Sequence, residues 1–497
     1  MAPHATTNTT ISASKLDISP KSPTENTFPT NEEGINASTL KPHNSTLHKP
    51  LDFTAFSNTI ACSPKDSVPN SPSKNLESHS SPSPCTLEPG PQIVNATKTD
   101  IEVAVAAAGQ AYESWGRATA YEERREQMRS FLGVLEMERE GFIKCIVREG
   151  GKPTFIAAAE FDGTLTRSHD LASLTLTDET VQETPTSHCL IRYYPLKVAA
   201  AIVPWNSPFH LLLVKLVPAI LAGCPVIAKP SPHAPYTVLK VVELASRVFS
   251  KGVVQAVSGA EEVGPWLTGM EGVAKISFTG SLEVGRKIFE SAAKGMKRLT
   301  LEFKRLYIHS SIYSAFRDAL VKAIQRLKVG DPEKESDVMI GPVQNKPQFE
   351  KVKTFFEAIE KESQKVALQG QPKNEKGFFL MPTIVDNPPE NSKIVQEEPF
   401  GPIAPLLSWT ETSDVIARAN ATDTGLGASI WSKDTVKARY IADRLEVGTV
   451  WINQGIDLSA HVPFGGHKLS GIGSELGGLQ AIKSYCNQQA VWISKES

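Results

Sequence analysis

The residues best placed for chemistry in this 497-residue chain lie where short apolar runs end. Asn206 follows the apolar run 198–203 and precedes an apolar stretch from Leu211 to Leu221. An asparagine amide at the carboxyl end of a strand can donate a hydrogen bond to an oxygen that gains negative charge during a reaction. A lone asparagine at such a point more often satisfies a turn. Asn206 on its own therefore leaves both interpretations open.

A second group of candidates has the residue types that hold phosphates and sugars. Lys229 comes directly after a short apolar run, where a lysine can reach ribose hydroxyls or a phosphate, although a lysine taken alone is typically solvated. Gly280, Ser281 and Gly285 follow another apolar run that ends at Phe278. Two glycines five residues apart leave room for backbone to approach a pyrophosphate at the start of a helix. Such a pair is weak evidence alone, because glycines are common at helix starts.

These candidates need a parallel sheet that brings them to one edge. Short apolar runs bounded by proline and glycine are typical of buried parallel strands. Strands that alternate with helices predict a doubly wound α/β domain. The predicted strands are 198–203, 225–228, 253–257 and 275–278, with a helix at 211–221 and two helices within 100–148.

A second α/β pattern runs from Tyr307 to about Val450. Its predicted helices are 311–328, 347–362, 413–420 and 434–444. The last segment, 480–495, is predicted to include a strand that can pair with the edge of another subunit. Residues 1–50 have too few large apolar side chains to offset the entropy lost on ordering, which predicts a disordered N-terminal extension.

The bulk composition excludes several classes of partner. Lys+Arg 52 against Asp+Glu 54 gives a net charge of -2, which favours neither nucleic acid nor a membrane surface as partner. No run reaches the roughly 18 apolar residues that a membrane span needs. The 6 cysteines contain no CxxC pair, which argues against a metal site or a disulfide framework. The N-terminus has no apolar leader core and no arginine before Arg117, so a cytoplasmic protein is predicted.

As an ordered set, these motifs resemble those of the NAD(P)-dependent aldehyde dehydrogenase superfamily. The similarity covers about residues 51–497 and is specific because further motifs follow in family order. They are Gly252-Val253-Val254, Leu301-Glu302, Gly341-Pro342, Glu397 to Pro402, Gly425 to Ala428 and Pro463 to Gly471.

The resemblance implies a role for each matching residue. Asn206 would be the side-chain half of an oxyanion hole. Glu302 would be the base that activates water, although a glutamate taken alone there would be a surface or helix-end carboxylate. The residues implied in dinucleotide binding are Lys229 at the adenosine ribose, Ser281 at the pyrophosphate, Glu398 and Phe400 at the nicotinamide ribose and ring, and the motif residues Trp205, Gly280 and Gly285. The expected cofactor is NAD, with NADP possible, and the expected substrate is a small-molecule aldehyde.

The resemblance also implies the architecture. The family fold has a Rossmann-like cofactor domain, an α/β catalytic domain and a small β oligomerisation arm through which subunits form homodimers or homotetramers. The expected cofactor domain is 51–179 with 197–300, the catalytic domain is 301–470, and the arm is 180–196 with 480–497.

The family pattern breaks directly after Glu302. Relatives continue there through a Leu-Gly-Gly segment, a strand, a helix and a Gly-Gln-x-Cys loop that carries the nucleophile, whereas this chain passes to Phe303-Lys304-Arg305. On the order of 35 residues are missing, enough for one strand, one helix and the loop. The loss removes the thiolate that attacks the aldehyde and exposes sheet edges in the catalytic domain. The cysteines that remain are Cys62, Cys85, Cys145, Cys189, Cys224 and Cys486, none of them in a matching position.

Two interpretations of this break stay open. In the first, the gene encodes an aldehyde dehydrogenase that oxidises an aldehyde to a carboxylic acid, and this chain lacks one segment of it. In the second, the chain is a pseudoenzyme that binds dinucleotide or partner subunits without catalysis. A smaller departure is Pro232, where many family members carry a glutamate that binds the adenosine ribose, so less repulsion would meet a 2′-phosphate.

Overall fold

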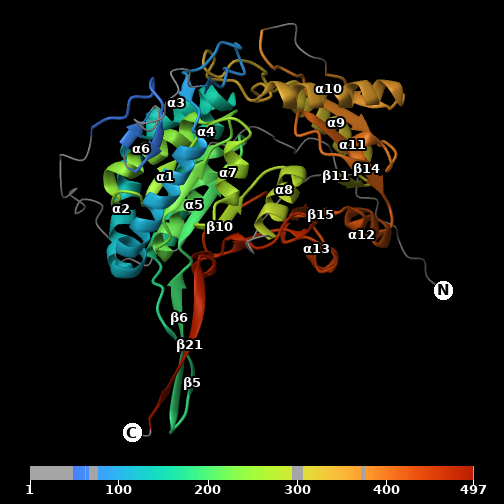
Figure 1. Cartoon of the computed structure of the whole chain (residues 1–497). Coiled ribbons are helices and arrows are strands. Elements are labelled where there is room, and N and C mark those ends of the chain that lie inside the picture. The colour runs from blue at the N-terminus through green and yellow to red at the C-terminus, as the bar shows by residue number, and fades with distance from the viewer. Residues whose placement is uncertain (1–48, 62, 66–76, 294–305, 371–375, 496–497) are drawn as a thin grey trace, which may run out of the picture. The chain divides into compact units, whose positions relative to one another are not determined.

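A six-stranded sheet organises the first half of the chain (Figure 1). The computed structural model describes residues 49–61, 63–65, 77–293, 306–370 and 376–495. The strand order is β10-β7-β8-β9-β1-β2, in which the first four strands run parallel and β1 is antiparallel to both of its neighbours, β9 and β2. The strands are β1 (Asn58–Ile60), β2 (Ser63–Lys65), β7 (Val198–Ile202), β8 (Val226–Lys229), β9 (Val254–Ala256) and β10 (Val273–Phe278). The four strands predicted from apolar runs, and the α/β class, are confirmed.

Helices cover both faces of this sheet because successive strand residues point to opposite sides. In β7, Ala199 and Ala201 pack with α2, α3, α4, α5 and α6. Val198, Ala200 and Ile202 pack on the other face with α1, α7 and α8. The helices are α1 (Lys98–Ala111), α2 (Tyr121–Met137), α3 (Arg139–Gly150), α4 (Thr154–Ser173), α5 (Pro208–Ala222), α6 (Tyr236–Val248), α7 (Val263–Gly269) and α8 (Leu282–Ala293).

The prediction of two helices within 100–148 is wrong. The region contains α1, a π-helical turn η1 (Tyr112–Ala118), α2 and α3. Helix α1 continues directly into η1, and the next two connections are only two residues and one residue long. Apolar spacing continues across them, so periodicity alone cannot reveal the breaks. The start of α1 is set by a capping box, in which Thr97 and Asp100 each accept a hydrogen bond from the other's backbone N–H.

The N-terminus of α6 is capped by a buried carboxylate from α3. Glu149 accepts hydrogen bonds from the backbone N–H of Tyr236 at 2.8 Å and of Thr237 at 3.2 Å. Burial raises the pKa of Glu149 to about 7, and its hydrogen bonds offset only part of that effect. The cap therefore connects α3 to α6. Above neutral pH the Glu149 carboxylate is charged while it is buried away from water, which is unfavourable.

Replacing Glu149 by glutamine should change how stability depends on pH. Between pH 4.5 and about 7 the unfolded chain has released this proton while the folded chain keeps it. The contribution of Glu149 to stability is therefore full below pH 4.5 and is lost as the pH rises through about 7. Urea unfolding at several pH values should show the free energy of unfolding of the wild type falling relative to Glu149→Gln across this window. A difference between the two proteins that stays constant with pH would contradict the assignment.

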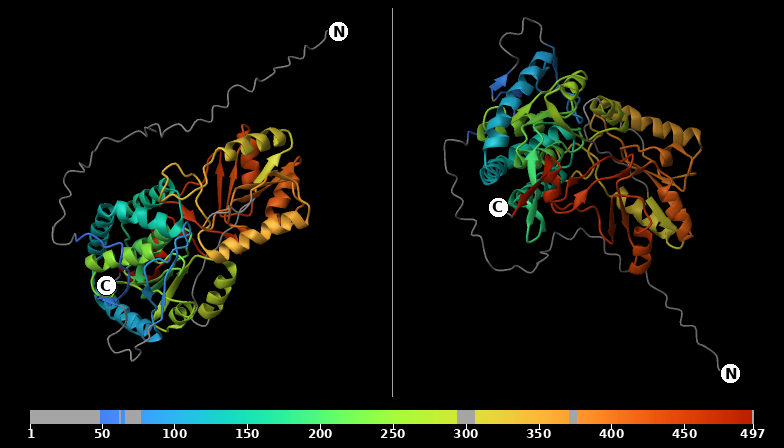
Figure 2. Two further views of the ribbon diagram at one scale, coloured as in Figure 1. Left: turned by 90° about the horizontal axis from the view of Figure 1, so that it is seen from above. Right: turned by 60° about the horizontal axis from the view of Figure 1, so that its bottom comes forward.

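A second, four-stranded sheet follows in the order β11-β14-β13-β12. Its strands are β11 (Leu306–His309), β12 (Val366–Leu368), β13 (Thr383–Asp386) and β14 (Ile403–Trp409). Helix α9 (Tyr313–Gln325) packs with Ile384 and Leu406 on one face, and α10 (Lys346–Lys361) packs with Val385 and Leu407 on the other. The left view of Figure 2 shows these two helices on either side of the sheet. Both helices were predicted and are confirmed, as are α12 (Thr412–Asn420) and α13 (Thr435–Ala442).

Two parallel strand pairs in this half lie at open sheet edges. Within the described residues, β11 pairs only with β14, and β16 (Gly427–Ile430) pairs only with β17 (Thr449–Ile452). Leu306 in β11 is 43% exposed, and Val436, soon after β16, is 78% exposed. Parallel strands are normally buried inside larger sheets, so an isolated parallel pair with exposed apolar neighbours is unusual. These edges agree with the expected loss of a strand and a helix after Glu302.

A three-stranded antiparallel sheet contains the last strand of the chain. Its order is β21-β6-β5, and Figure 1 shows the three strands side by side. The strands are β5 (Glu179–Glu183), β6 (Ser187–Pro195) and β21 (Cys486–Ser494). Helix α14 (Leu479–Lys483) occupies the start of the segment 480–495, and the predicted strand follows it as β21. Every helix in the described ranges is too short or too polar to cross a lipid bilayer.

Candidate active site

The sequence candidates meet at the carboxyl edge of the first sheet because three strands end there in register. Ile202 of β7 is paired with Phe278 of β10 on one side and with Lys229 of β8 on the other. Trp205 and Asn206 follow β7, and Gly280 and Ser281 follow β10. Ligands of doubly wound sheets bind outside the carboxyl ends of the strands. This edge is therefore the candidate dinucleotide site.

Lys229 is a buried cation in this edge. Its side chain is 9% exposed, and its ammonium forms no hydrogen bond or ion pair within the described residues. Burial lowers the pKa of Lys229 to about 8, and the charge of Glu261 opposes that effect. A buried charge without a partner is unfavourable unless a ligand supplies one. The surroundings of the Lys229 side chain are therefore suited to binding a ligand group that accepts hydrogen bonds.

The turn after β10 presents the start of α8 to the same edge. The backbone N–H of Gly285 donates to the Ser281 carbonyl at 2.9 Å, and that of Val284 approaches the Ser281 hydroxyl at 3.4 Å. Ser281 thus occupies the N-cap of a 12-residue helix, whose first N–H groups attract anions. A Cβ at Gly280 would come within 2.5 Å of the Phe278 ring. Glycine therefore allows the tight turn.

A cavity of about 300 Å³ lies beside Asn206. Trp205 and Phe400 line it in an edge-to-face arrangement, with ring centroids 5.3 Å apart. The side-chain oxygen of Asn206 is buried and accepts no hydrogen bond from the described part of the chain. A buried amide oxygen without a partner beside a cavity is available to a ligand that donates a hydrogen bond. The structure therefore brings Asn206, Trp205 and Phe400 together.

Helix α10 holds the loop that carries Glu398 and Phe400. Lys351 donates to the Glu398 carbonyl at 3.0 Å, and Gln348 donates to the Pro399 carbonyl at 2.7 Å. Phe400 has a positive φ of 50°, which is unusual for an aromatic residue and indicates a backbone held by its surroundings. Glu398 itself is half-buried. The predicted base, Glu302, lies outside the described residues.

None of the cysteines in the described ranges replaces the absent nucleophile. Cys145 and Cys224 are buried, and burial raises the pKa of both thiols, that of Cys224 to about 11. Cys486 is half-buried, with a pKa raised by burial to about 12. Such thiols carry almost no reactive thiolate at neutral pH. Cys85 is buried against Phe379.

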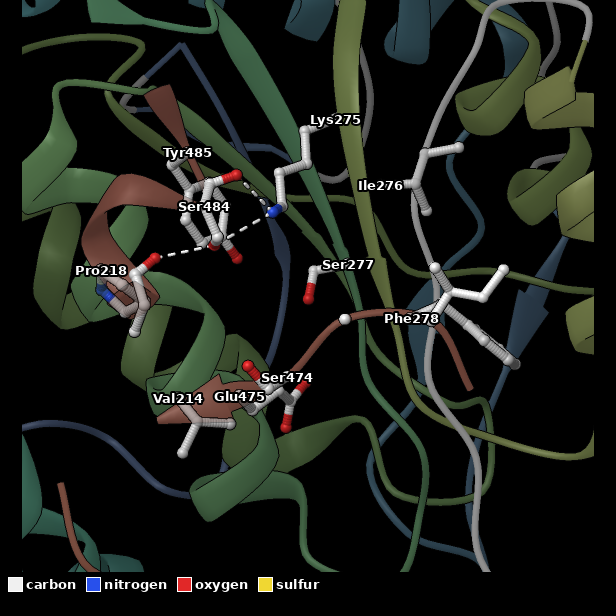
Figure 3. A pocket seen from close by; sticks show the side chains of 13 residues that line it. Val214, Pro218, Lys275, Ile276, Ser277, Phe278, Ser474, Glu475, Ser484 and Tyr485 are labelled. Atoms are coloured by element: carbon white, nitrogen blue, oxygen red, sulfur yellow. Dashed lines mark hydrogen bonds between the residues drawn. The ribbon is translucent and has the colours of Figure 1, made fainter. Parts of the chain in front are cut away.

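A buried ion pair next to this edge was missed by the sequence analysis. Lys215 of α5 forms an ion pair with Glu475 and donates a hydrogen bond to the Thr279 hydroxyl at 2.7 Å. Thr279 also donates to Glu475 at 3.4 Å, and Figure 3 shows Glu475 close to the end of β10. The sequence feature that could have predicted this ion pair is a lysine within an otherwise apolar helical stretch, because a lysine is seldom buried without a partner.

The C-terminal segment is fixed to the same strand. Lys275 of β10 donates to the Ser484 carbonyl at 2.7 Å and lies 4.1 Å from the centre of the Tyr485 ring, as Figure 3 shows. A lysine ammonium over an aromatic ring is attracted by the electrons of the ring. This contact holds the start of β21 against the six-stranded sheet.

A second polar cluster that was missed lies between α4 and α5. Lys152 forms a largely buried ion pair with Glu160 and donates to the Ser207 hydroxyl at 3.3 Å. His210 Nδ1 lies 3.1 Å from the Thr164 hydroxyl, and burial lowers the pKa of His210 to about 3. Lys152 also lines the cavity next to Asn206. One wall of that cavity is therefore charged, while His210 stays neutral at physiological pH.

The chain matches the model of the aldehyde dehydrogenase family over residues 71–304 and 302–491, two segments that meet where the sequence pattern breaks. It is 35% identical to aldehyde dehydrogenase LUC3 from Fusarium sp over 483 positions, covering 90% of this chain and 100% of that protein. Since 90% of 497 residues is about 447, roughly 36 of those 483 positions have no counterpart here. It is also 34% identical to a probable aldehyde dehydrogenase from Pseudomonas sp, over 83% of this chain and 91% of that protein.

Solved structures show the same fold. The NAD+ complex of aldehyde dehydrogenase from Bacillus cereus superposes with a TM-score of 0.84 at 27% identity, covering 89% of this chain and 97% of that one. Betaine aldehyde dehydrogenase from Staphylococcus aureus in complex with NAD+ superposes with a TM-score of 0.83, also at 27% identity, over 89% and 96%. This chain belongs to the aldehyde dehydrogenase family, whose members oxidise aldehydes.

Proposed function

We propose that the gene behind this chain serves NAD(P)-dependent oxidation of an aldehyde to a carboxylic acid, and that the chain of 497 residues binds the dinucleotide without oxidising aldehyde. The observation that carries the proposal is the intact carboxyl edge of the first sheet beside a catalytic half with open strand edges. The nearly complete coverage of family relatives supports it. A sharp break between well-kept motifs is more typical of an omitted coding segment than of gradual decay.

Each residue at this edge would bind a different part of the dinucleotide. Lys229 would bind the adenosine ribose, and the first turn of α8 at Ser281 would bind the pyrophosphate. Glu398 and Phe400 would hold the nicotinamide ribose and ring. The bound dinucleotide would supply a hydride acceptor. Asn206 would donate a hydrogen bond to the aldehyde oxygen as it gains charge.

The alternative is a pseudoenzyme that uses dinucleotide binding to regulate or join partner subunits. The two proposals require different transcripts. The first requires a longer transcript that encodes a Gly-Gln-x-Cys run between the codons of Glu302 and Phe303. Sequencing the transcript across codons 300–310 separates them. If only the short message exists, the pseudoenzyme reading is correct.

Loss of the Lys229 charge should weaken dinucleotide binding. A hydrogen bond to a charged group contributes about 1.5–3 kcal/mol, so Lys229→Met is expected to raise the Kd of NADH about 10- to 100-fold. Enhancement of NADH fluorescence by the full chain measures that Kd. Lys251→Met, which removes an exposed lysine, is the matched control and should bind like the wild type. Equal Kd values for the two variants would show that Lys229 does not bind the dinucleotide.

We further propose that the three-stranded sheet is an arm that forms homodimers or homotetramers. Trp492 and Ile493 in β21 are exposed, and an edge strand with exposed apolar side chains can pair with another chain. Trp492→Ser with Ile493→Ser should shift the molecular mass from light scattering toward the monomer, whereas Ile456→Ser, at an exposed site elsewhere, should not. An unchanged mass in the double variant would contradict the proposal that this sheet joins subunits.

We also propose a cytoplasmic location. The free cysteines of the described ranges agree with a reducing compartment.

A further inference from the structure

An arginine of helix α4 has no partner in the part of the chain that the structure describes. Arg167 is half-buried, its Nε is fully buried, and its guanidinium forms no hydrogen bond or ion pair with the described residues. A buried polar group without a partner is unfavourable unless a ligand supplies one. A guanidinium is suited to carboxylates, because its N–H groups form a planar fork. Arg167 is therefore a candidate ligand-binding residue.

Helix α4 holds the Arg167 side chain against its own surface. Long side chains of a helix point back toward the N-terminus and cover the preceding turn. A Cβ placed on Gly163, one turn earlier, would come within 3.2 Å of Arg167 Nη1. The guanidinium thus lies over Gly163, and the absence of a side chain there leaves room for it.

Arg167 lies next to the segment that carries Asn206. His210, four residues after Asn206, has its Nδ1 3.1 Å from the Thr164 hydroxyl, and its backbone N–H donates to Glu160 at 3.3 Å. Glu160, Thr164 and Arg167 are spaced four and three residues apart, so they share one face of α4. Burial and then the charge of Arg167 lower the pKa of His210, to about 3. The unpaired guanidinium is therefore close to one wall of the candidate active site.

The two lysines of this region already have counter-charges. Lys152 forms an ion pair with Glu160, and Lys215 forms one with Glu475. Each pair is neutral overall, so neither lysine requires an anionic ligand. Arg167 differs from both lysines, because no carboxylate of the described residues lies within ion-pairing distance of it.

Two carboxylates act on Arg167 from a longer distance. Burial lowers the pKa of Arg167, and the charges of Asp457 and then Asp170 offset only part of that effect. Asp457 is exposed, and its side chain accepts a hydrogen bond from Gln454 at 2.9 Å. Water screens the charge of an exposed carboxylate. A ligand carboxylate in direct contact with Arg167 would therefore interact with it more strongly than Asp457 does.

We propose that Arg167 binds a carboxylate at the end of the substrate opposite the aldehyde, so that the substrate class of this site is the carboxy-aldehydes. The inference rests on the proposed function, because it requires the aldehyde group to lie at Asn206. A carboxylate can accept two hydrogen bonds from the guanidinium and neutralise its charge. An uncharged aldehyde of the same length would leave Arg167 unpaired.

Equilibrium binding by the full chain tests this subsite without turnover. The probes are succinamate, glutaramate and adipamate, each compared with the diamide of the same length. Both members of a pair offer an amide that can donate to Asn206, and they differ only in the charge of the other end. In ligand-observed NMR titrations, the preferred acid should bind about 10-fold more tightly than its diamide.

Variants of Arg167 assign the preference to its guanidinium. Arg167→Met should bind acid and diamide alike, while Arg129→Met, at an exposed arginine of α2, should keep the preference. Neither substitution should change the Kd of NADH. If NADH binds and every acid binds no better than its diamide, the inference is wrong while the proposed function stands. If NADH does not bind, the proposed function fails, and the inference fails with it.

Gly163→Ala tests the position of the guanidinium without removing its charge. The added Cβ should displace the end of the Arg167 side chain and reduce the preference for the acid several-fold. The helix should tolerate the change, because alanine has a higher helix propensity than glycine. Gly133→Ala in α2, where a Cβ meets nothing within 4 Å, is the matched control and should bind like the wild type. Equal preferences in the two alanine variants would contradict the subsite.

Discussion

The purified chain should form no NADH or NADPH when it is supplied with an aldehyde, and insertion of the absent segment between Glu302 and Phe303 should restore that activity. Removing a catalytic nucleophile lowers turnover by about a million-fold in a well-studied hydrolase, which sets the scale of the expected change. The thiolate forms the covalent intermediate, and no cysteine in the described ranges lines the cavity beside Asn206. Absorbance at the wavelength of the reduced dinucleotide measures the outcome.

The insert is best taken from the corresponding stretch of LUC3, which is 35% identical to this chain. The control is the same insert with its cysteine replaced by alanine, which should repair the fold without restoring oxidation. Both inserted proteins should also melt at a higher temperature than the original chain, because the new strand can pair with the open edges of β11 or β16. Robust turnover by the chain without an insert would refute the prediction.

Loss of the Lys215 ammonium should have the largest effect on stability. The lysine is 1% exposed, and Glu475 is mostly buried, so removing one partner leaves an uncompensated buried charge. Breaking such a pair typically destabilises a protein by about 3–5 kcal/mol. Lys215→Met should therefore lower the free energy of unfolding by about that amount in urea titrations.

Two comparisons isolate the ion pair from general effects of mutation. Lys287→Met breaks an ion pair with Glu283 whose side chains are 70% and 79% exposed, and it should change stability by less than about 0.5 kcal/mol. The double variant Lys215→Met with Glu475→Gln should recover part of the loss, because no unpaired charge remains. A small effect of Lys215→Met, similar to that of Lys287→Met, would show that the pair is open to water.

The cofactor half was predictable from sequence because its signals are local. Each strand of the parallel sheet is a short apolar run, and the turn that follows it carries Asn206, Lys229 or Ser281. Strand and turn are adjacent in the chain, so a motif of ten residues contains both the support and the functional group. The register of Ile202 with Lys229 and Phe278 then confirmed that the turns share one edge.

The catalytic half was predictable only in part. Its helices α9 and α10 were found from their apolar spacing, but the central strand β14 was not predicted as a separate element. That strand pairs with β11 and β13, which are about 100 and 20 residues earlier, and pairing over such separations leaves no local pattern. The helix breaks within 100–148 were missed because apolar periodicity crosses the short connections.

The sequence by itself determined the family, the motifs of the candidate dinucleotide site and the absence of the Gly-Gln-x-Cys loop, since each of these is a property of residue order. The tertiary structure decided which charges are buried and which meet. Lys215, Thr279 and Glu475 come from distant positions, and only folding brings them within hydrogen-bonding distance. Likewise, only the structure shows that Lys229 is buried without a partner among the described residues, because burial depends on what the rest of the chain packs around a side chain.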